Sequence, residues 1–354
     1  MNLRPTICVV SAIVMASLAG CSTRNTSRRP GSIAARTGDE IVVAGHFVHT
    51  GTRVVTWMDP GGYDGYRVER RFTAFEQSNW ETSRVAVAEL KTPNRYGLRQ
   101  HVLSPGQIER VRGGGWDLPL LQEVVDQFVL HFDVAGTSRQ CFKVLHDLRG
   151  LSVHFMLDLD GMIYQTLDVK ERAWHATSSN TRSVGIEIAN IGAYPSADAK
   201  PLGEWYTRDA DGQTRLQIPA RLGDGGQQTR NFIGRPARPE PVVGEIQGRT
   251  LHQYDFTPEQ YRALTHLTAA LCQVLPKIRC DYPRDATGQL VTAKLPDEQL
   301  DNFQGILGHY HIQQNKVDPG PALQWERVVH GARTLMGAKP PMGHGAELLQ
   351  PQNR

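Results

Sequence analysis

Blocks of apolar residues in the middle of the chain predict buried strands. The run QFVLH, residues 127–131, is short and apolar and ends on a histidine. The stretch VHFMLDLDGMIYQTL, residues 153–167, is divided by an Asp-Gly pair, which predicts two strands joined by a turn. The run SVGIEIA, residues 183–189, predicts another buried strand with one carboxylate, Glu187, set within it.

Helical spacing follows these strands. Residues 139–149 place apolar side chains at helical intervals. A longer helix is expected to begin at Thr257, because Thr suits the N-cap, the following proline suits the first turn, and Gln260 completes a capping box. Its apolar face would consist of Tyr261, Leu264, Leu267, Leu271 and Val274.

Other parts of the chain lack this clear periodicity. Residues 40–47 and 52–58 predict two short strands at the start of an extension, 40–117, whose role the sequence does not indicate. Residues 194–249 are rich in Gly, Pro, Arg and Gln, and an unstructured loop of that length is usually functional or disordered. A second insertion covers about 280–296, and the tail, 338–354, is expected to be loose.

The first residues have the pattern of an export signal. Arg4 precedes an apolar stretch, residues 6–19, that is too short for a standard membrane-spanning helix. The stretch ends in Leu-Ala-Gly before Cys21, which resembles a bacterial lipoprotein signal that is cleaved after residue 20 and acylated on Cys21. An ordinary secretory signal with a chance cysteine is the alternative, and both interpretations predict export.

A lipid on Cys21 would anchor the protein to a membrane surface without spanning it. Ser22 resembles the residue that directs lipoproteins to the outer membrane, so we expect the protein to face the periplasm. Residues 21–39 are polar and basic and predict a flexible tether.

Charge and cysteine content narrow the possible functions. The chain has 354 residues and a formal net charge of +3, with no long Lys/Arg run, so a nucleic acid is not an expected partner. Beyond the N-terminal segment the cysteines are Cys141, Cys272 and Cys280, of which the last two could form a disulfide after export. No CxxC pair provides a thiolate zinc site.

The segment GHYHIQQNKVDPGP, residues 308–321, concentrates candidate chemistry near the end of the chain. His309 and Asp318 flank a loop of suitable length to converge on one metal ion. Lys316 would lie nearby, where a cation suits stabilisation of an oxyanion. A polar turn without function is the alternative.

Two further residues are ambiguous by themselves. A lone histidine after a strand, such as His131, is more often structural than a metal ligand. Glu187 lies in an apolar strand, so it is either buried with a partner or exposed on the solvent face.

Six segments in order resemble the zinc-dependent N-acetylmuramoyl-L-alanine amidases, the family of AmpD, phage T7 lysozyme and the peptidoglycan recognition proteins. The segments are FVLHF, LSVHFMLDLDGMIYQ, ERAWHATSSN, SVGIEIAN, FTPEQYRAL and GHYHIQQNKVDPGPALQW. The resemblance covers an amidase domain at 118–337, interrupted by the two insertions. It implies an α/β fold in which a central mixed β-sheet is flanked by helices, with one Zn²⁺ in a surface cleft.

The resemblance also implies roles for individual residues. The metal ligands would be His131, His309 and Asp318, and the catalytic residues would be Glu187, as base, and Lys316. The substrate groove would include Trp174, His175 and Asn180.

Some positions separate this chain from particular relatives. Val153 stands where T7 lysozyme carries a catalytic tyrosine, so the AmpD-like arrangement is the better match. His311 is a rival for His309, but the Gly-His match favours His309. Phe132 replaces a polar residue that touches substrate in AmpD, and AmpD lacks the insertion at 194–249. The resemblance therefore does not predict that this chain shares AmpD's preference for substrates with a 1,6-anhydro sugar.

The implied reaction is hydrolysis of the amide between N-acetylmuramic acid and L-alanine, in peptidoglycan or in soluble muropeptides. The expected partners are that substrate and, through Cys21, a membrane. A non-catalytic peptidoglycan-binding module and a zinc hydrolase of another amide are the alternatives. The complete set of ligand and catalytic residues favours the amidase.

Overall fold

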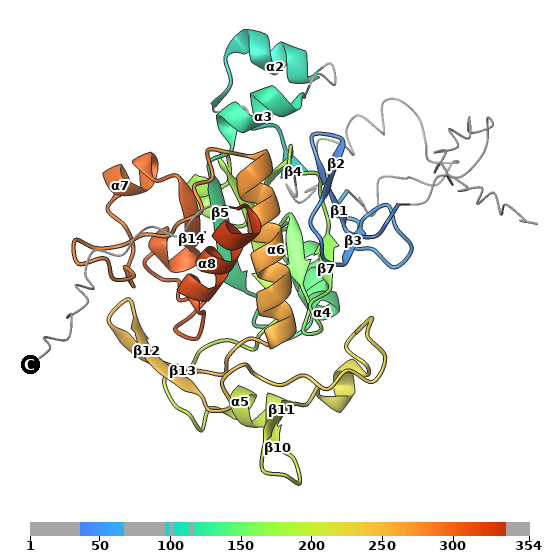
Figure 1. Cartoon of the computed structure of the whole chain (residues 1–354), viewed down its shortest axis with the longest axis vertical. Coiled ribbons are helices and arrows are strands. Elements are labelled where there is room, and N and C mark those ends of the chain that lie inside the picture. Colours follow the sequence, from blue (N-terminus) through green and yellow to red (C-terminus); the bar gives the residue numbers. More distant parts are fainter. Residues whose placement is uncertain (1–35, 67–95, 100–101, 113–115, 338–354) are drawn as a thin grey trace, which may run out of the picture. The chain divides into compact units, whose positions relative to one another are not determined.

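The computed structural model describes residues 36–66, 96–99, 102–112 and 116–337 (Figure 1). The described residues from Thr37 onward belong to one compact unit. The predicted signal segment, Cys21 and the tail at 338–354 lie outside the described residues. Within the described part, no helix is both long and apolar enough to cross a membrane.

A six-stranded sheet forms the centre of this unit. Its strand order is β14-β5-β9-β6-β7-β3. Neighbouring strands are parallel except for the antiparallel pair β6 and β7. The bounds are β14 Gly305–Gly308, β5 Gln127–Phe132, β9 Ser183–Ile188, β6 Phe155–Leu157, β7 Ile163–Gln165 and β3 Val54–Thr56. The predicted mixed central sheet is confirmed.

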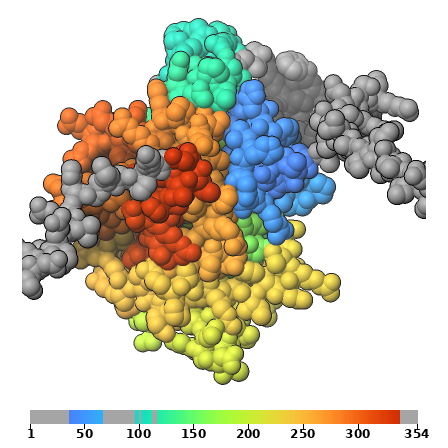
Figure 2. Space-filling model, viewed as in Figure 1, coloured from blue at the N-terminus to red at the C-terminus, as the bar shows by residue number. Residues whose placement is uncertain are grey.

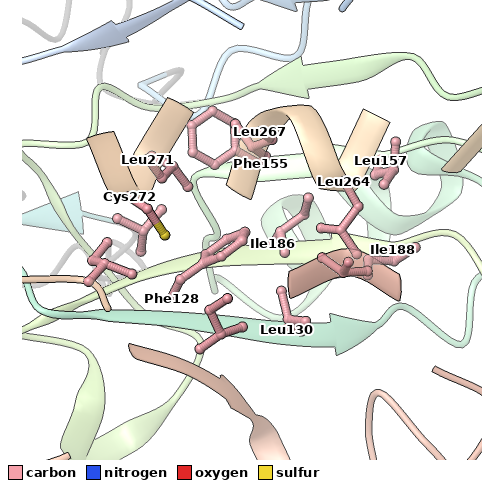
Figure 3. Packing of buried hydrophobic residues seen from close by; sticks show 14 of the residues in the cluster. Phe128, Leu130, Phe155, Leu157, Ile186, Ile188, Leu264, Leu267, Leu271 and Cys272 are labelled. Carbon is pink, nitrogen blue, oxygen red and sulfur yellow. The ribbon is translucent and has the colours of Figure 1, made fainter. Parts of the chain in front are cut away.

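Helix α6, Pro258–Val274, covers one face of the sheet. Its side chains Leu264, Leu267 and Leu271 pack against apolar residues of the strands (Figure 3). The strand residues in this layer are Phe128 and Leu130 of β5, Phe155 and Leu157 of β6, and Ile186 and Ile188 of β9. Burying one such leucine stabilises the fold by about 1.5–3 kcal/mol. The predicted capping box between Thr257 and Gln260 is present at the start of α6.

The opposite face of the sheet is covered by shorter helices. Alternation along β6 turns Met156 away from α6 and towards a second cluster. That cluster includes Cys141 and Phe142 of α4, Ser138–Phe142, and Leu145 of the π-helix η3, Lys143–Leu148. On the α6 side, α8, Trp325–Leu335, packs against α6. Helices therefore flank both faces, as predicted.

The N-terminal extension contributes to the central sheet. The predicted strand at 40–47 is wrong in its extent, because Ala44 and Gly45 adopt positive φ angles of 48° and 78° and reverse the chain. The result is an antiparallel hairpin of β1, Glu40–Val43, and β2, His46–His49. The second predicted strand contains β3, which pairs with β7 at the edge of the sheet.

Among the other described residues of the extension, the regular elements are one short strand and one helix. Strand β4, Tyr96–Gly97, pairs with β8, Arg172–Ala173, and α2, Pro105–Arg112, follows. Helix α3, Leu118–Val124, begins at Asp117, whose carboxylate accepts the Leu120 N–H.

The insertion at 194–249 is structured, contrary to the expectation of a long loop. It contains α5 Lys200–Trp205, β10 Tyr206–Arg208, β11 Thr214–Leu216, the 3-10 helix η5 Ala220–Leu222 and β12 Val242–Ile246, which pairs with β13 Arg249–Gln253. Trp205 is buried in a cluster with Leu159 and Ala189 next to the central sheet. These elements are too short for periodicity to reveal them. In Figure 2 they form much of the lower surface, in yellow-green and yellow.

The second insertion contains an isolated bridge between Arg284 and Leu290 and leads into α7, Asp297–Asn302. Cys272 on α6 and Cys280 after it are free thiols that make a side-chain hydrogen bond with each other. Their predicted disulfide stays a prediction.

Candidate active site

Three of the predicted site residues converge at one end of the sheet. His131 lies near the carboxyl end of β5, and His309 opens the 3-10 helix η6, His309–His311, directly after the neighbouring parallel strand β14. Their Nδ1 atoms are 3.0 Å apart. Asp318 Oδ2 lies 2.8 Å from His131 Nδ1 and 3.0 Å from His309 Nδ1. The three residues are buried and could together hold a metal ion.

The remaining ring nitrogens have their own partners. His309 Nε2 lies 2.6 Å from Gln313 Oε1, an acceptor, so it carries the proton. His131 Nε2 lies 3.0 Å from His175 Nδ1, and His175 Nε2 lies 3.2 Å from Ser183 Oγ. These contacts leave Nδ1 of both His131 and His309 able to present a lone pair to a metal ion, as hydrogen-bond partners of metal-binding histidines do.

The donor set fits zinc. Two imidazole nitrogens and one carboxylate oxygen, with a position left for water, are a common catalytic zinc arrangement. Tetrahedral bonds of about 2.0–2.1 Å place ligand atoms roughly 3.3 Å apart. The observed separations of 2.8–3.0 Å are close to that spacing.

The protonation states suit metal binding. Burial, followed by the charge of His309, lowers the pKa of His131 to about 4, so its imidazole is neutral at pH 7. Burial by itself raises the pKa of Asp318, but the two histidines more than offset it and hold that pKa well below its usual range. A neutral imidazole and an ionised carboxylate are the forms that bind a cation.

Glu187 faces this cluster from the next strand. It is the register partner of His131 between β9 and β5, so both side chains lie on the same side of the sheet. It is buried, and its Oε2 has no hydrogen-bond partner among the described residues. Burial, reinforced by Asp318 and Asp133, raises its pKa well above the usual range. A buried carboxylate with a raised pKa is typical of a general base.

Lys316 lies in the loop between η6 and Asp318 and is half-buried. Its backbone N–H donates to the Gln313 carbonyl at 3.1 Å. Its charge lowers the pKa of both His131 and Glu187. The catalytic role of Lys316 stays a prediction.

The three predicted substrate residues make supporting contacts. His175 stands against His131, as described above. Asn180 is buried, and its Oδ1 accepts the N–H groups of His175 and Ala176 at 3.0 and 2.7 Å. Trp174 is half-buried, with the Arg172 guanidinium 4.1 Å from its ring centroid. Their contact with substrate stays a prediction.

His311 lies outside the cluster, as expected. Its Nδ1 accepts the Gly308 N–H at 2.8 Å, and its Nε2 donates to the Val291 carbonyl at 2.7 Å. Burial lowers its pKa to about 3. Both nitrogens are therefore used within the fold.

The sequence analysis missed three residues that support the site. Gln313 fixes His309, and its only sequence signal is its position four residues later. Gly185 on β9 lies against His175, because a Cβ there would be 2.5 Å from the imidazole ring. Arg99, from the extension, is fully buried and bonds to carbonyls around the loop that carries His175.

Several solved structures are similar to part of this chain. The endolysin amidase LysCS from Clostridium intestinale URNW is 15% identical, with a TM-score of 0.31, and the match covers 62% of this chain and 88% of that one. A selenomethionine derivative of AmpD is 18% identical, with a TM-score of 0.29, and the match covers 59% of this chain and 86% of that one. The Ph2119 endolysin from a Thermus scotoductus bacteriophage is 15% identical, with a TM-score of 0.30, and the match covers 59% of this chain and 84% of that one. No curated protein sequence matches the chain.

The family model described as N-acetylmuramoyl-L-alanine amidase matches residues 121–321, more than half of the chain. The matched range begins before β5 and ends after Asp318, so it includes the metal cluster and Glu187. The chain belongs to the N-acetylmuramoyl-L-alanine amidase family, a family of enzymes that act on peptidoglycan.

Proposed function

We propose that this enzyme is zinc-dependent, with His131, His309 and Asp318 as the metal ligands, Glu187 as the general base and Lys316 as an oxyanion donor. The observation that carries the proposal is Glu187, a buried carboxylate with an unpartnered oxygen, set in register with the ligand His131. Leaving such a group unpaired costs folding free energy, and a role as general base would account for its position beside His131.

A zinc ion held by these ligands would supply Lewis-acid activation of a water and of the amide carbonyl. Glu187 is suited to accept the proton of the attacking water, because burial raises the pKa of its carboxyl group and so makes the carboxylate a stronger base. The same carboxyl group would then give the proton to the leaving amine of L-alanine.

The Lys316 ammonium would stabilise negative charge that develops on the amide oxygen. Such donors act strongly where water is excluded and they are already in place. His175 and Gln313 would orient the two ligand histidines through the hydrogen bonds described above. Trp174 and Asn180 would help to shape the substrate groove.

The test is a digestion of purified peptidoglycan by zinc-loaded enzyme, with and without a chelator. We expect release of stem peptides with a free L-alanine N-terminus, loss of release with chelator, and recovery when zinc is added back. Mass spectrometry identifies the new N-terminus. An enzyme that is zinc-loaded and folded but releases no such peptide would support the non-catalytic binding module. Release of a different amine would support a zinc hydrolase of another amide.

We also propose that the enzyme is exported and anchored through a lipid on Cys21, facing the periplasm from the outer membrane. The order of Arg4, an apolar stretch, small residues and Cys21 supports this. Expression in a Gram-negative host followed by mass spectrometry should identify an acylated N-terminal cysteine. A Cys21→Ala variant should lose the lipid, and an unmodified mature N-terminus at another residue would contradict the proposal.

A further inference from the structure

The segment that carries two of the proposed metal ligands lies beyond the end of the sheet. Strand β14 ends at Gly308, η6 supplies His309, and residues 312–324 then run to α8 in turns that include Asp318. We call residues 309–322 the ligand loop. Because metal affinity depends on how firmly the ligand atoms are held, the contacts that fix this loop bear directly on the site.

The hairpin of β12 and β13 at the end of the insertion lies outside the central sheet (Figure 1). It is nevertheless anchored in the body of the protein. Ile246 and Leu251 are buried in the main apolar cluster. The His252 N–H donates to the Tyr194 carbonyl at 2.7 Å, and the Tyr194 N–H donates to the His252 carbonyl at 2.9 Å. A hairpin anchored in this way can hold other segments in position.

Gln253, the last residue of β13, is fully buried against the ligand loop. Its Nε2 donates to the Pro319 carbonyl at 3.1 Å, and its Oε1 accepts the Ala322 N–H at 2.9 Å. The loop passes so close that a Cβ on Gly320 would lie 2.1 Å from Oε1. The carboxamide therefore bridges the part of the loop that directly follows Asp318.

Gln247, at the turn of the hairpin, contacts the other end of the ligand loop. Its Nε2 donates to the Tyr310 carbonyl at 2.7 Å and to the Gln313 carbonyl at 3.2 Å. Its Oε1 accepts the Lys294 N–H at 3.1 Å. Tyr310 directly follows His309, so this carboxamide holds the backbone of η6 next to the ligand.

The turn of the hairpin is an unusual place for a glutamine. Gln247 and Gly248 have φ angles of 55° and 69°, both positive, as a two-residue hairpin turn of type I′ requires. Such turns favour Asn, Asp or Gly at the first position, because other side chains are strained in the left-handed region. The hydrogen bonds from the Gln247 carboxamide to the ligand loop would offset this strain.

We propose that Gln247 and Gln253 are positioning residues, which hold the His309 and Asp318 ends of the ligand loop from two points of one hairpin. The inference rests on the proposed function, which makes His309 and Asp318 metal ligands. The hairpin also reaches the strand that carries the general base, since Gln253 Nε2 donates at 3.3 Å to Oδ1 of Asn190, just after β9. Part of the insertion thus acts on the metal site without touching the metal.

The test measures zinc affinity in Gln247→Leu and Gln253→Leu, which remove the carboxamide but keep a side chain of similar volume. We expect the dissociation constant for zinc to rise about tenfold in each variant, the lower end of the range for residues that support metal ligands. When Co²⁺ replaces zinc, the visible absorption of the bound ion should also change, because it reports the ligand geometry. With saturating zinc, KM should stay within about twofold of wild type.

Gln165→Leu is the matched control. Gln165 on β7 is fully buried, and its carboxamide bonds to the backbone of Val42 and Leu167. Three strands separate β7 from β14, so this variant should lose stability to denaturant and keep its zinc affinity and Co²⁺ spectrum.

Equal weakening of zinc binding in Gln165→Leu and Gln253→Leu would overturn the inference, as would unchanged affinity in both hairpin variants. Gln247 is only half-buried, so Gln247→Leu provides the comparison if Gln253→Leu does not fold.

If the wild type binds no zinc, the proposed function fails, and hydrogen exchange of the metal-free protein decides the inference separately. Backbone amides of the ligand loop should exchange roughly tenfold faster in Gln247→Leu than in wild type, because the hydrogen bonds to Tyr310 and Gln313 are lost. Amides of β5 and β9 should exchange at the wild-type rate. Unchanged exchange in the ligand loop would overturn the inference.

Discussion

Buried polar atoms have close partners in the cluster of His131, His309 and Asp318, whereas one on the neighbouring strand β9 does not. In the cluster, His131, His309 and Asp318 bring their donor atoms within 3.0 Å of one another, and outer partners hold both histidines. On β9, Glu187 is equally buried, yet its Oε2 has no hydrogen-bond partner among the described residues. The first region is organised for binding. The second holds a buried carboxylate at a cost in folding free energy, which fits the general-base role proposed for Glu187.

The largest effect should come from breaking the cluster. Asp318→Ala removes the only charged residue among the proposed ligands and should reduce zinc content and activity by more than about a thousandfold. Removing a residue that is only hydrogen-bonded to a ligand typically costs about 10- to 100-fold. Metal analysis and the peptidoglycan digestion measure both. His330→Ala, a change at an exposed histidine of α8, is the control. Full zinc occupancy in Asp318→Ala would contradict the ligand assignment.

Glu187→Gln should separate chemistry from binding. Activity should fall by roughly 10²–10⁴-fold, the usual contribution of general acid–base catalysis, while zinc stays bound. Activity within a few fold of wild type would show that another group is the base.

The same variant tests the cost of burying the charge. Because the folded-state pKa of Glu187 is raised, its contribution to stability is fully present below the unfolded pKa of about 4.5 and is lost as pH rises through the folded value. In metal-free protein, Glu187→Gln should therefore gain stability relative to wild type between pH 5 and pH 8. Denaturant unfolding at several pH values measures the difference, and a widening advantage for wild type would refute the raised pKa.

Lys316→Met should lower kcat by roughly 10²–10³-fold, as loss of an oxyanion donor does, with little change in zinc affinity. Lys200→Met, at an exposed lysine of α5, is the matched control. A change confined to KM would instead assign Lys316 to substrate binding.

The smallest expected effect concerns the outer partner of His309. Gln313→Ala removes the acceptor of His309 Nε2–H and should weaken zinc binding by about 10- to 100-fold, with activity recovering in excess zinc. Gln314→Ala, at the exposed neighbouring residue, should have no effect. Unchanged zinc affinity in Gln313→Ala would mean that η6 positions His309 without help.

The sequence allowed prediction of the parts of the site that lie in recognisable motifs. His131 and Glu187 occur in apolar runs that predict buried strands, and His309 and Asp318 share one short loop. The structure confirms these strands and the helix at Thr257.

Supporting contacts could not be predicted, because they depend on distant segments meeting in space. Gly185 leaves room for a ring that belongs to another loop, and Arg99 comes from an extension without any chemical motif. The insertion was misjudged because its elements have only three to six residues, and its buried Trp205 packs on the sheet.

Arg99 has a practical consequence for dissecting this enzyme. Its guanidinium donates to the carbonyls of Thr181, Ser183 and Val169 at 2.7, 3.1 and 2.9 Å, and it has no access to solvent. A truncated protein that starts at residue 118 would match the predicted start of the amidase domain but would leave those carbonyls without the guanidinium that they bind. The smallest fragment that folds and retains catalysis should therefore begin before Arg99, well upstream of His131.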